Sequence, residues 1–531
     1  MKWLLAILLC LSFNLFAQDN PYLLLRDLNR TLGQLNYRPQ SAEAAVVEYQ
    51  KVYPNEQKLT HFAIELNKGL AFKISENIAI SGEELTLLHK TLKTMLVMHD
   101  RLLTLSAGFE PKNPSDMIDA DLENSSRSLF WLNMQYASLS RIVKIYDAFM
   151  HVDKLRYYLN SKDSAYQVEK DQLKALISLL LSKSYLDQIS GGLSSLERRP
   201  QLVERHRNDS ALFDQLYIML DRYAGREFVE SSKLADERIE MYDRWAKKDG
   251  GTRMKNFVFH HVSGAFGNFA GAIRWREGYL DRNPKLNAEI VSRLRPFDMI
   301  TERTPFALTD KFIPGNFGHN AIWLGTKEQL MELGFWDHPS VVPLQAAIER
   351  GQSIIETDRT GTHLKDIAEF MKIDEFAIMR NKDIAEDPFK MEKLLEVSIA
   401  QLGKKYDFNF DVETTDRLVC SELLYQSFGD IKWPTEYVLG RHTISPDNVT
   451  ELMFYENPPN ELVYYVYAEK KDKLTYPTLF DLAPKLGYRL NEERSTSDQP
   501  YFEERTKKCK KMIKNDKIFD ACTTIWVHHV Y

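Results

Sequence analysis

Apolar residues recur at intervals of three and four along much of the first half of the chain. In residues 83–103 this spacing places them on one face of an α-helix. Glycine and proline are sparse inside such runs and cluster between them, as at residues 108–111 and 191–192. The pattern predicts helices from about residue 41 to 247, arranged as a bundle or as hairpins within a helical domain spanning residues 18–247. Similar runs cover residues 129–159, 173–186 and 211–223.

The pattern changes after Lys248-Asp249-Gly250-Gly251, which we interpret as a linker within a segment of linker and helix at residues 248–290. Short β-branched and aromatic runs bounded by turn residues then predict strands. Helical patterns at residues 391–402 and 419–428 lie between these runs. The fold class is therefore α+β, with a small antiparallel sheet and helices packed beside it. The strand runs are residues 297–301, 320–324, 353–356, 376–379 and 462–467.

The N-terminus has the layout of a secretory signal peptide. Met1-Lys2 is a short positive segment, residues 3–16 are apolar apart from two polar positions, and the small residue Ala17 follows. We predict a signal peptide over residues 1–17 with cleavage after Ala17. A membrane anchor is the alternative, but the apolar run is shorter than the ~20 residues that span a bilayer. We expect export to the periplasm or beyond the cell, with no transmembrane segment in the mature chain.

The charge balance excludes a broad nucleic-acid surface. The chain of 531 residues has a formal net charge of -6 and a pI near 6.2, whereas phosphate binding needs concentrated lysine and arginine. Four of the five residues in Lys507-Lys508-Cys509-Lys510-Lys511 are basic. We interpret this run as a solvated part of a C-terminal tail at residues 491–531, with contact to an anionic surface as the alternative.

Export changes the interpretation of the cysteines. Cys10 leaves with the signal peptide, so Cys420, Cys509 and Cys522 remain. An odd count in an oxidising compartment suggests one pair and one free thiol, and the two cysteines of the tail are the natural pair. The alternative is that both of these stay reduced. Cys420 is unpaired in either case, and is therefore either buried and inert or functional.

Three segments carry residue types suited to nucleophilic catalysis. His319 begins an apolar strand, Glu356 ends the next predicted strand, and Cys420 lies where a turn gives way to an amphipathic helix. The helix N-terminus favours the thiolate over the thiol. An imidazole can take the thiol proton, and a carboxylate can orient that imidazole through its other nitrogen. The amide groups of the helix N-terminus can also stabilise an oxyanion.

The order of these segments resembles a known superfamily. A histidine, a carboxylate on the following strand, the motif Tyr406-Asp407-Phe408-Asn409-Phe410 and then Cys420-Ser421-Glu422 are similar to the YiiX/YebB-like branch of the circularly permuted NlpC/P60 enzymes. In ordinary NlpC/P60 enzymes the cysteine precedes the histidine, whereas the permuted branch reverses this order, as here. The resemblance covers about residues 294–447 and leaves the helical half without a counterpart.

The resemblance implies a papain-like hydrolase domain, which we place at residues 291–490. It implies Cys420 as nucleophile, His319 as general base and Glu356 as the third catalytic residue. Family members usually have a small or apolar residue after that carboxylate, whereas this chain continues Thr357-Asp358. Asp358 is therefore the substitute candidate for the orienting role. The loop over residues 304–316 is a candidate for shaping the substrate groove.

Three functional hypotheses remain open. The first is hydrolysis or transfer of an acyl group from an amide, ester or thioester, acting on cell-wall peptides. The second is a lipid-directed acyl hydrolase or acyltransferase, and the third is a non-catalytic envelope binding or scaffold protein. The chemistry requires no metal or organic cofactor. A Cys/His/Glu zinc site is disfavoured, because one thiolate without a second close pair is a poor zinc pattern. The sequence leaves the oligomeric state and the role of the helical half undetermined.

Overall fold

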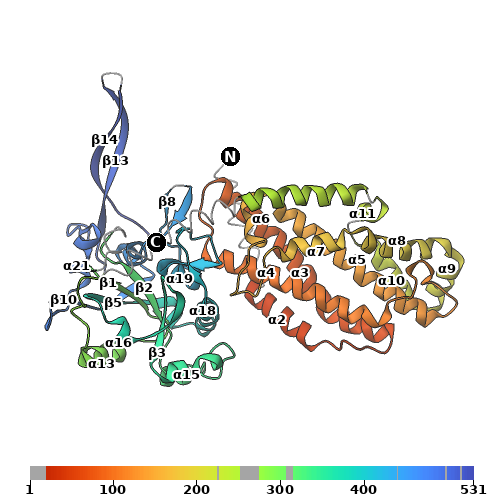
Figure 1. Ribbon diagram of the computed structural model, residues 1–531, viewed down its shortest axis with the longest axis horizontal. Coiled ribbons are helices and arrows are strands. Elements are labelled where there is room, and N and C mark those ends of the chain that lie inside the picture. The colour runs from red at the N-terminus through yellow and green to blue at the C-terminus, as the bar shows by residue number, and fades with distance from the viewer. Residues whose placement is uncertain are drawn as a thin grey trace. The chain divides into compact units, whose positions relative to one another are not determined.

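The computed structural model describes residues 20–223, 226–231, 233–251, 274–306, 315–438, 440–496, 499–514 and 517–531 (Figure 1). The predicted signal peptide and its cleavage site lie outside these residues, as do parts of the segment 248–290 and of the loop 304–316. Within the described ranges no helix combines the length and the apolar character needed to cross a bilayer. The chain forms two compact units, a helical unit of Met1–Ile80 with Thr86–Lys255 and an α+β unit of Ser81–Leu85 with Asn256–Tyr531.

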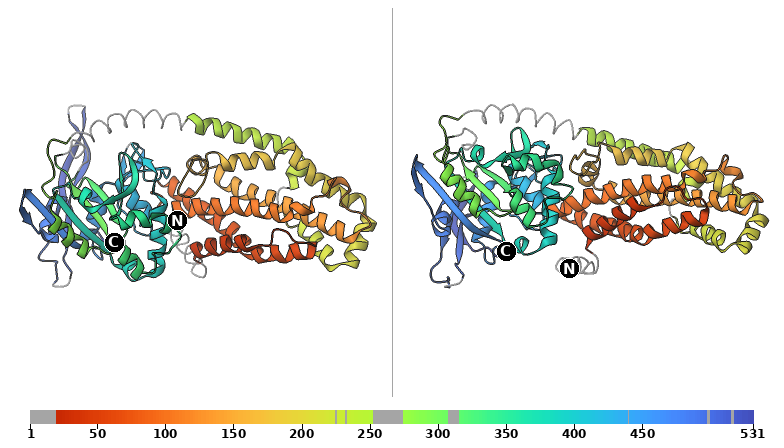
Figure 2. Two further views of the ribbon diagram at one scale, coloured as in Figure 1. Left: turned by 60° about the horizontal axis from the view of Figure 1, so that its bottom comes forward. Right: turned by 90° about the horizontal axis from the view of Figure 1, so that it is seen from below.

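The helical unit confirms the helices that the three- and four-residue spacing predicted, and its long helices run alongside one another (Figure 2). Polar side chains begin several of these helices, since Ser41 and Asp121 accept backbone N–H groups of the first turn. Its elements are α2 (Pro21–Gln34), α3 (Ala42–Ser75), α4 (Gly82–Ser106), η1 (Ala107–Phe109), η2 (Pro114–Asp116), α5 (Leu122–Met150), α6 (Asp153–Leu159), α7 (Gln172–Leu180), α8 (Lys183–Arg198), α9 (Pro200–Asp209), α10 (Ala211–Leu220), α11 (Arg226–Glu230) and the helical residues 233–251.

The glycine pair at residues 191–192 does not separate two helices as the sequence pattern indicated. Both residues lie inside α8. A Cβ atom on Gly192 would come within 2.8 Å of a Leu132 methyl group on α5. The close approach of the two helices therefore selects glycine here, and this packing outweighs its poor helix propensity.

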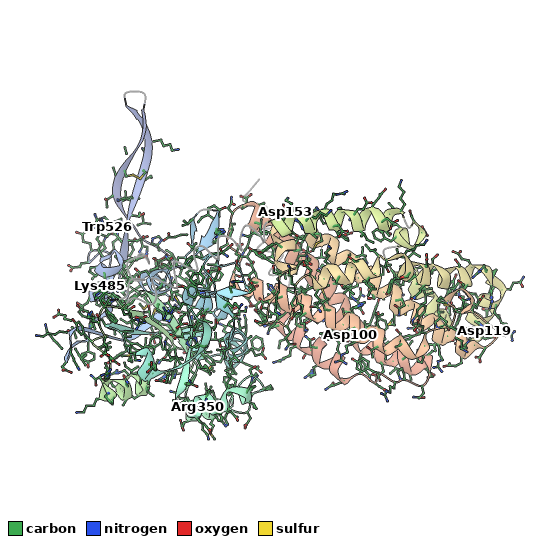
Figure 3. The ribbon with its side chains drawn as sticks, viewed as in Figure 1. Asp100, Asp119, Asp153, Arg350, Lys485 and Trp526 are labelled. Atoms are coloured by element: carbon green, nitrogen blue, oxygen red, sulfur yellow. A yellow bond between two sulfur atoms is a disulfide. The ribbon has the colours of Figure 1, made fainter. Side chains whose placement is uncertain are left out.

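The predicted linker at residues 248–251 is helical. Asp249 is buried and accepts two hydrogen bonds from the buried guanidinium of Arg156, at 2.9 and 2.8 Å. A third guanidinium hydrogen bond reaches the Met150 carbonyl at 2.8 Å, and Asp153 lies beside the same group (Figure 3). This buried ion pair ties the helix to α6, because neither charge can be released without its partner.

Breaking that pair is expected to destabilise the helical unit. Asp249→Ala leaves the buried arginine with only the exposed Asp153 as a charged partner and should lower the free energy of unfolding by about 3 kcal/mol. The matched control is Asp243→Ala, whose carboxylate is half-exposed and pairs with Lys174 at 2.9 Å. Its cost should stay within about 1 kcal/mol. Urea denaturation of both variants measures the difference, and equal costs would refute a structural role for the buried pair.

The α+β unit is built on a seven-stranded sheet in the order β11-β10-β5-β1-β2-β3-β4, in which all neighbours are antiparallel. All five predicted strand runs fall on this sheet, and the two predicted helices are α18 and α19. The strands are β1 (Met299–Arg303), β2 (His319–Trp323), β3 (Gln352–Asp358), β4 (Gly361–Asp366), β5 (Glu375–Asn381), β10 (Asn460–Lys470) and β11 (Lys473–Thr475).

Helices and short ladders surround this sheet. The helices are α13 (Pro284–Arg293), α14 (Lys327–Glu332), η4 (Val342–Leu344), α15 (Gln345–Glu349), α16 (Ile367–Phe370), α17 (Lys382–Ala385), α18 (Pro388–Ala400), α19 (Cys420–Ser427), α20 (Pro446–Glu451), η5 (Leu452–Phe454), α21 (Leu479–Leu482) and η6 (Ala483–Leu486). The ladders pair β6 (Lys405–Tyr406) with β7 (Arg417–Leu418), and β8 (Glu436–Val438) with β9 (Arg441–Thr443).

Both faces of the sheet are buried. On β2, Ile322 joins an apolar cluster that includes Leu423 of α19. Its neighbour Trp323 points to the other face and joins a cluster that includes Ile290 of α13. The central strands are therefore apolar on both sides, and α19 is fixed against β2 on one of them.

The predicted tail largely belongs to a separate three-stranded sheet, formed by β12 (Tyr488–Leu490), β13 (Phe502–Lys514) and β14 (Lys517–Val527). Cys509 and Cys522 face each other across β13 and β14 and form a disulfide, in agreement with their pairing as the natural partners. The remaining thiol, Cys420, is free and buried. The sequence did not predict these strands, because the exposed residues of the lysine run show no alternation of apolar and polar side chains.

Candidate active site

Three elements of the α+β unit converge on the predicted catalytic residues. His319 is the first residue of β2, Cys420 is the first residue of α19, and Glu356 lies on β3 opposite Ala321 of β2. The sheet order makes β2 and β3 neighbours, and α19 packs on β2. Residues separated by about a hundred positions in the chain are therefore adjacent in space.

The three side chains lie close together. The Nε2 atom of His319 lies 3.0 Å from Glu356 Oε2. The imidazole and the thiol of Cys420 each shift the pKa of the other, so these two groups are also electrostatic neighbours. The Glu356 side chain is 2% exposed and that of His319 is 16% exposed, while Cys420 as a residue is 7% exposed. Solvent thus reaches the imidazole more readily than the carboxylate behind it.

The electrostatics favour a thiolate–imidazolium pair. Burial raises the pKa of Cys420, but the His319 charge and hydrogen bond, the Asn320 backbone N–H and the Ser421 hydroxyl outweigh it, so the net pKa is lowered. Burial lowers the pKa of His319, yet the charges and hydrogen bonds of Cys420 and Glu356 raise it well above its usual range. Both shifts stabilise the charged forms, which is the condition for a reactive thiolate at neutral pH.

Glu356 is held as a carboxylate by a cluster of cations. Its Oε1 atom lies 3.2 Å from Nε2 of His363 and accepts a hydrogen bond from the Lys365 ammonium. Burial raises the pKa of Glu356, but the hydrogen bonds of His319 and His363 and the charges of His319 and Lys365 hold it well below its usual range. The hydrogen bond to Glu356 also raises the pKa of His363. The Glu356 carboxylate is therefore ionised over the pH range in which the His319 imidazole is protonated.

The substitute candidate for the orienting role, Asp358, takes a different position. Its Oδ1 atom accepts hydrogen bonds from the Thr360 backbone N–H at 2.8 Å and from the Thr360 hydroxyl at 2.5 Å. The same atom lies 3.9 Å from Nδ1 of His363. The carboxylate that contacts the His319 ring is that of Glu356.

Neighbouring polar groups fix the nucleophile's helix against the sheet. The Ser421 hydroxyl donates to Asn320 Oδ1 at 2.9 Å, which joins α19 to β2 directly beside the thiol. Glu422 accepts the Val419 backbone N–H at 2.8 Å and thereby caps the first turn. Burial and the nearby Cys420 charge raise the pKa of Tyr406 well above its usual range, so its phenol is a neutral group close to the thiol.

A partly buried carboxylate holds the backbone that leads into His319. Asp447 accepts the backbone N–H groups of Asn316 and Phe317, each at 2.8 Å. Burial raises the pKa of Asp447 to about 6, while those two amide groups oppose the shift. A Cβ atom on Gly315, whose φ is +113°, would lie 2.2 Å from this carboxylate, so only glycine fits the approach.

Among the described residues, two groups each bring three side chains that can ligate a metal within reach of one ion, and neither contains Cys420. Glu356, Asp358 and His363 form one group, and in it the Glu356 carboxylate already forms an ion pair with Lys365. The other is His338 with Glu392 and Glu396 of α18, all partly exposed. The disfavoured zinc site of Cys420, His319 and Glu356 is thus not among these clusters.

The sequence interpretation missed the cations behind Glu356. His363 and Lys365 lie on β4, which follows β3 through a tight turn and was not predicted as a strand. The available signal was the turn sequence Asp358-Arg359-Thr360-Gly361 followed by polar residues two positions apart. Gly361 has a φ of +112°, and a Cβ atom there would lie 2.4 Å from the Lys404 carbonyl oxygen.

The two-sided antiparallel sheet, with a thiol at the start of a helix beside an imidazole, defines the α+β unit as a papain-like cysteine hydrolase. Residues 293–487, about a third of the chain, match the model of the Peptidase_C92 family, described as permuted papain-like amidase enzymes of the YaeF/YiiX type. The resemblance to the YiiX-like branch is thereby confirmed for this unit. No curated protein and no solved structure matches the chain.

The charge state of Cys420 can be measured by its alkylation with iodoacetamide. Because the net pKa of the thiol is lowered, the pH–rate profile should have its midpoint below the ~8.5 of a free thiol. In His319→Ala the charge and hydrogen bond of the imidazole are lost, while burial and the smaller contributions of Asn320 and Ser421 remain, so the midpoint should move to higher pH. His338→Ala removes another partly exposed imidazole and should leave the profile unchanged. A thiol indifferent to His319 would contradict the pairing.

Proposed function

We propose that this protein hydrolyses amide bonds through Cys420, His319 and Glu356. The observation that carries the proposal is the 3.0 Å contact between His319 and the buried Glu356, together with mutual pKa shifts of Cys420 and His319 that favour the thiolate–imidazolium pair. Cys420 is the nucleophile, His319 moves the proton, and Glu356 orients the imidazole through Nε2. The family match to amidases supports the reaction class.

The reaction proceeds in two stages. The Cys420 thiolate attacks the carbonyl carbon, and a sulfur–carbon bond forms while the carbon–nitrogen bond breaks. The His319 imidazolium gives its proton to the leaving amine, which leaves a thioester on the enzyme. Water, deprotonated by the now neutral His319, then attacks the thioester and releases the carboxylic acid and the thiolate. The amide and one water become an acid and an amine, and the chemistry requires no cofactor.

The start of α19 supplies groups for the oxyanion formed in each stage. Backbone N–H groups in the first turn of a helix have no intrahelical acceptor, and the helix dipole adds partial positive charge there. Cys420 and Ser421 are the first two residues of this helix. An oxyanion formed at the attacked carbon would lie next to these amides.

The substrate class that fits best is a peptide of the cell wall, reached after export. The signal-peptide layout of residues 1–17 and the disulfide between Cys509 and Cys522 both suit an oxidising compartment outside the cytosol. The polar surroundings of the thiol, including Asn320 and Tyr406, suit an amide with its hydrogen-bonding groups. They offer less to an acyl chain, so the peptide substrate is preferred to a lipid.

Replacement of the nucleophile tests the proposal directly. Cys420→Ala should abolish release of new amino groups from peptidoglycan-derived peptides, followed by mass spectrometry. Glu356→Gln should lower kcat about a hundredfold, because the imidazole loses its orienting charge. Asp358→Asn is the matched control on the same strand and should stay within about threefold of wild type. Full activity of Cys420→Ala would rule out the proposed mechanism.

The cation behind Glu356 makes a second, independent prediction about the pH dependence of kcat/KM. Activity should rise as Cys420 ionises and fall as His319 loses its proton. Lys365→Met removes a positive charge, which raises the pKa of nearby groups, so both limbs should move to higher pH. Glu356→Gln removes a negative charge beside the imidazole and should move the basic limb to lower pH. Lys372→Met, an exposed lysine paired with Glu369, is the control. Shifts of the opposite sign would contradict the ion-pair arrangement.

A further inference from the structure

The longest strand of the seven-stranded sheet has an open edge. On one side, β10 pairs with β5 along residues 460–467. On its other side lies β11, a strand of three residues whose pairing with β10 begins only at Tyr467. Within the described part of the chain, the outward N–H and C=O groups of residues 460–466 therefore face no partner strand. An edge of this kind is a template for a further strand.

A cavity of about 510 Å³ follows this edge, on the side of the unit where β10 and α21 lie (Figure 1). Its lining includes six consecutive residues of β10, 460–465. Successive side chains of a strand point to opposite faces, so a cavity lined by six in a row lies along the edge and not over one face. Residues 477–479 and 499–500 line the same cavity, which therefore separates the edge from these two segments.

A buried amide at the start of β10 has an unused donor. Asn460 is fully buried, and its Oδ1 atom accepts a hydrogen bond from Asn381 Nδ2 at 3.1 Å. No described residue provides a hydrogen-bond partner for its Nδ2 atom. A buried donor left unpaired is costly, and Asn460 lines the cavity. The cavity is thus the place from which a ligand oxygen can accept this hydrogen bond.

The charges around the cavity cancel. Among the residues that line it, the charged ones are Lys382 and Glu461, which are about half-exposed and lie 3.8 Å from each other. The rest of the lining is mainly aromatic and aliphatic, and it includes the prolines Pro458, Pro477 and Pro500. Such a lining favours neither an anion nor a cation and accepts apolar side chains. An open strand edge, a free amide donor and a neutral lining together match an extended peptide with uncharged side chains.

From this arrangement we infer that the cavity binds an extended, uncharged peptide segment of a partner protein, which adds to β10 as a strand. The peptide backbone pairs with the outward groups of residues 460–466, and its side chains occupy the apolar lining. One of its carbonyl groups accepts the free hydrogen bond of Asn460. The volume of the cavity is within the ~300–1,000 Å³ of ligand sites, and the open edge is about 20 Å long.

This site is separate from the proposed catalytic centre. The strand register places His319 level with Val466 of β10. Asn460 lies about 20 Å further along the strand, and β10 is three strands away from β2. A peptide bound along this edge therefore leaves Cys420 free, and the inference does not depend on the proposed reaction.

Edge protection and pairing with a second copy are the alternative explanations. The register of β10 is irregular between Leu462 and Tyr464, and such bulges discourage the pairing of strand edges. This feature explains an unpaired edge, but not a buried donor beside a cavity. Because residues 477–479 and 499–500 line the cavity as well, its shape favours a single extended chain over the edge of another folded sheet.

Phage display of random linear heptapeptides supplies the probe, with protein that lacks residues 1–17 and carries Cys420→Ala so that no bound peptide is cleaved. Selection should enrich uncharged sequences, and the most enriched peptide, synthesised with capped ends, should bind in calorimetry. Gln499→Trp places a bulky ring at an exposed lining position and should weaken binding at least about tenfold. The matched control is Gln57→Trp, an exposed position on α3, which should bind like the parent protein.

N-methylation of the selected peptide tests strand addition itself. Every second N–H of an added strand faces β10, so methylating one alternate set of residues should abolish binding and methylating the other set should leave it within about threefold. Asn460→Leu should weaken binding about tenfold, with its folding checked by thermal denaturation. Equal losses from both methylated sets, or no peptide that distinguishes Gln499→Trp from Gln57→Trp, would overturn the inference. So would a dimer that Gln499→Trp converts to a monomer in sedimentation, because a second copy would then occupy the edge.

Discussion

Burying a thiolate and an imidazolium together is costly, and the rest of the active site exists to offset that cost. Each ion loses its hydration when it leaves water, and the attraction within one pair seldom repays the loss. Here the charges alternate along a series, with Cys420 against His319, His319 against Glu356, and Glu356 against Lys365. Each ion has an opposite charge beside it. The carboxylate in the middle is the element on which the others depend.

The sheet topology supplies this arrangement without strain. The β2 strand presents His319 at its start, β3 presents Glu356 beside it, and the tight turn into β4 brings Lys365 behind the carboxylate. The helix that begins at Cys420 packs on the same strand as the histidine. Because neighbouring strands fix the spacing, the order of the residues in the chain is immaterial. A permuted chain therefore builds a papain-like site.

The elements that could be predicted from the sequence are those whose side chains all lie in the same kind of environment. Runs such as residues 376–379 are buried on both faces, and their composition alone indicated strands. The helix N-terminus at Cys420 and the strand start at His319 were also predictable, since both lie at sharp changes of pattern. Both features have local sequence signals, because local backbone structure determines where a helix or a strand begins.

The errors occurred where a distant contact decided the structure. Gly192 is helical because Leu132 packs against it, and Asp249 is helical because Arg156 holds it. Neither partner can be inferred from the neighbouring residues. The contact of Lys365 with the carboxylate was not predicted for a related reason. A lysine on a short polar strand is usually solvated. The role of Lys365 depends on Glu356, with which its ammonium forms an ion pair across β3 and β4.

Lysines occupy two electrostatic settings in the α+β unit. Lys365 is partly exposed and is matched to a buried carboxylate, so its charge is compensated within the fold. The hairpin residues Lys507, Lys508, Lys510 and Lys511 are exposed, and the strand register places Lys511 opposite Asp520. An exposed ion pair contributes little because water screens it, whereas a cation beside a buried carboxylate decides whether that carboxylate stays charged. The position of a lysine in the fold, and not its residue type, therefore determines what its charge does.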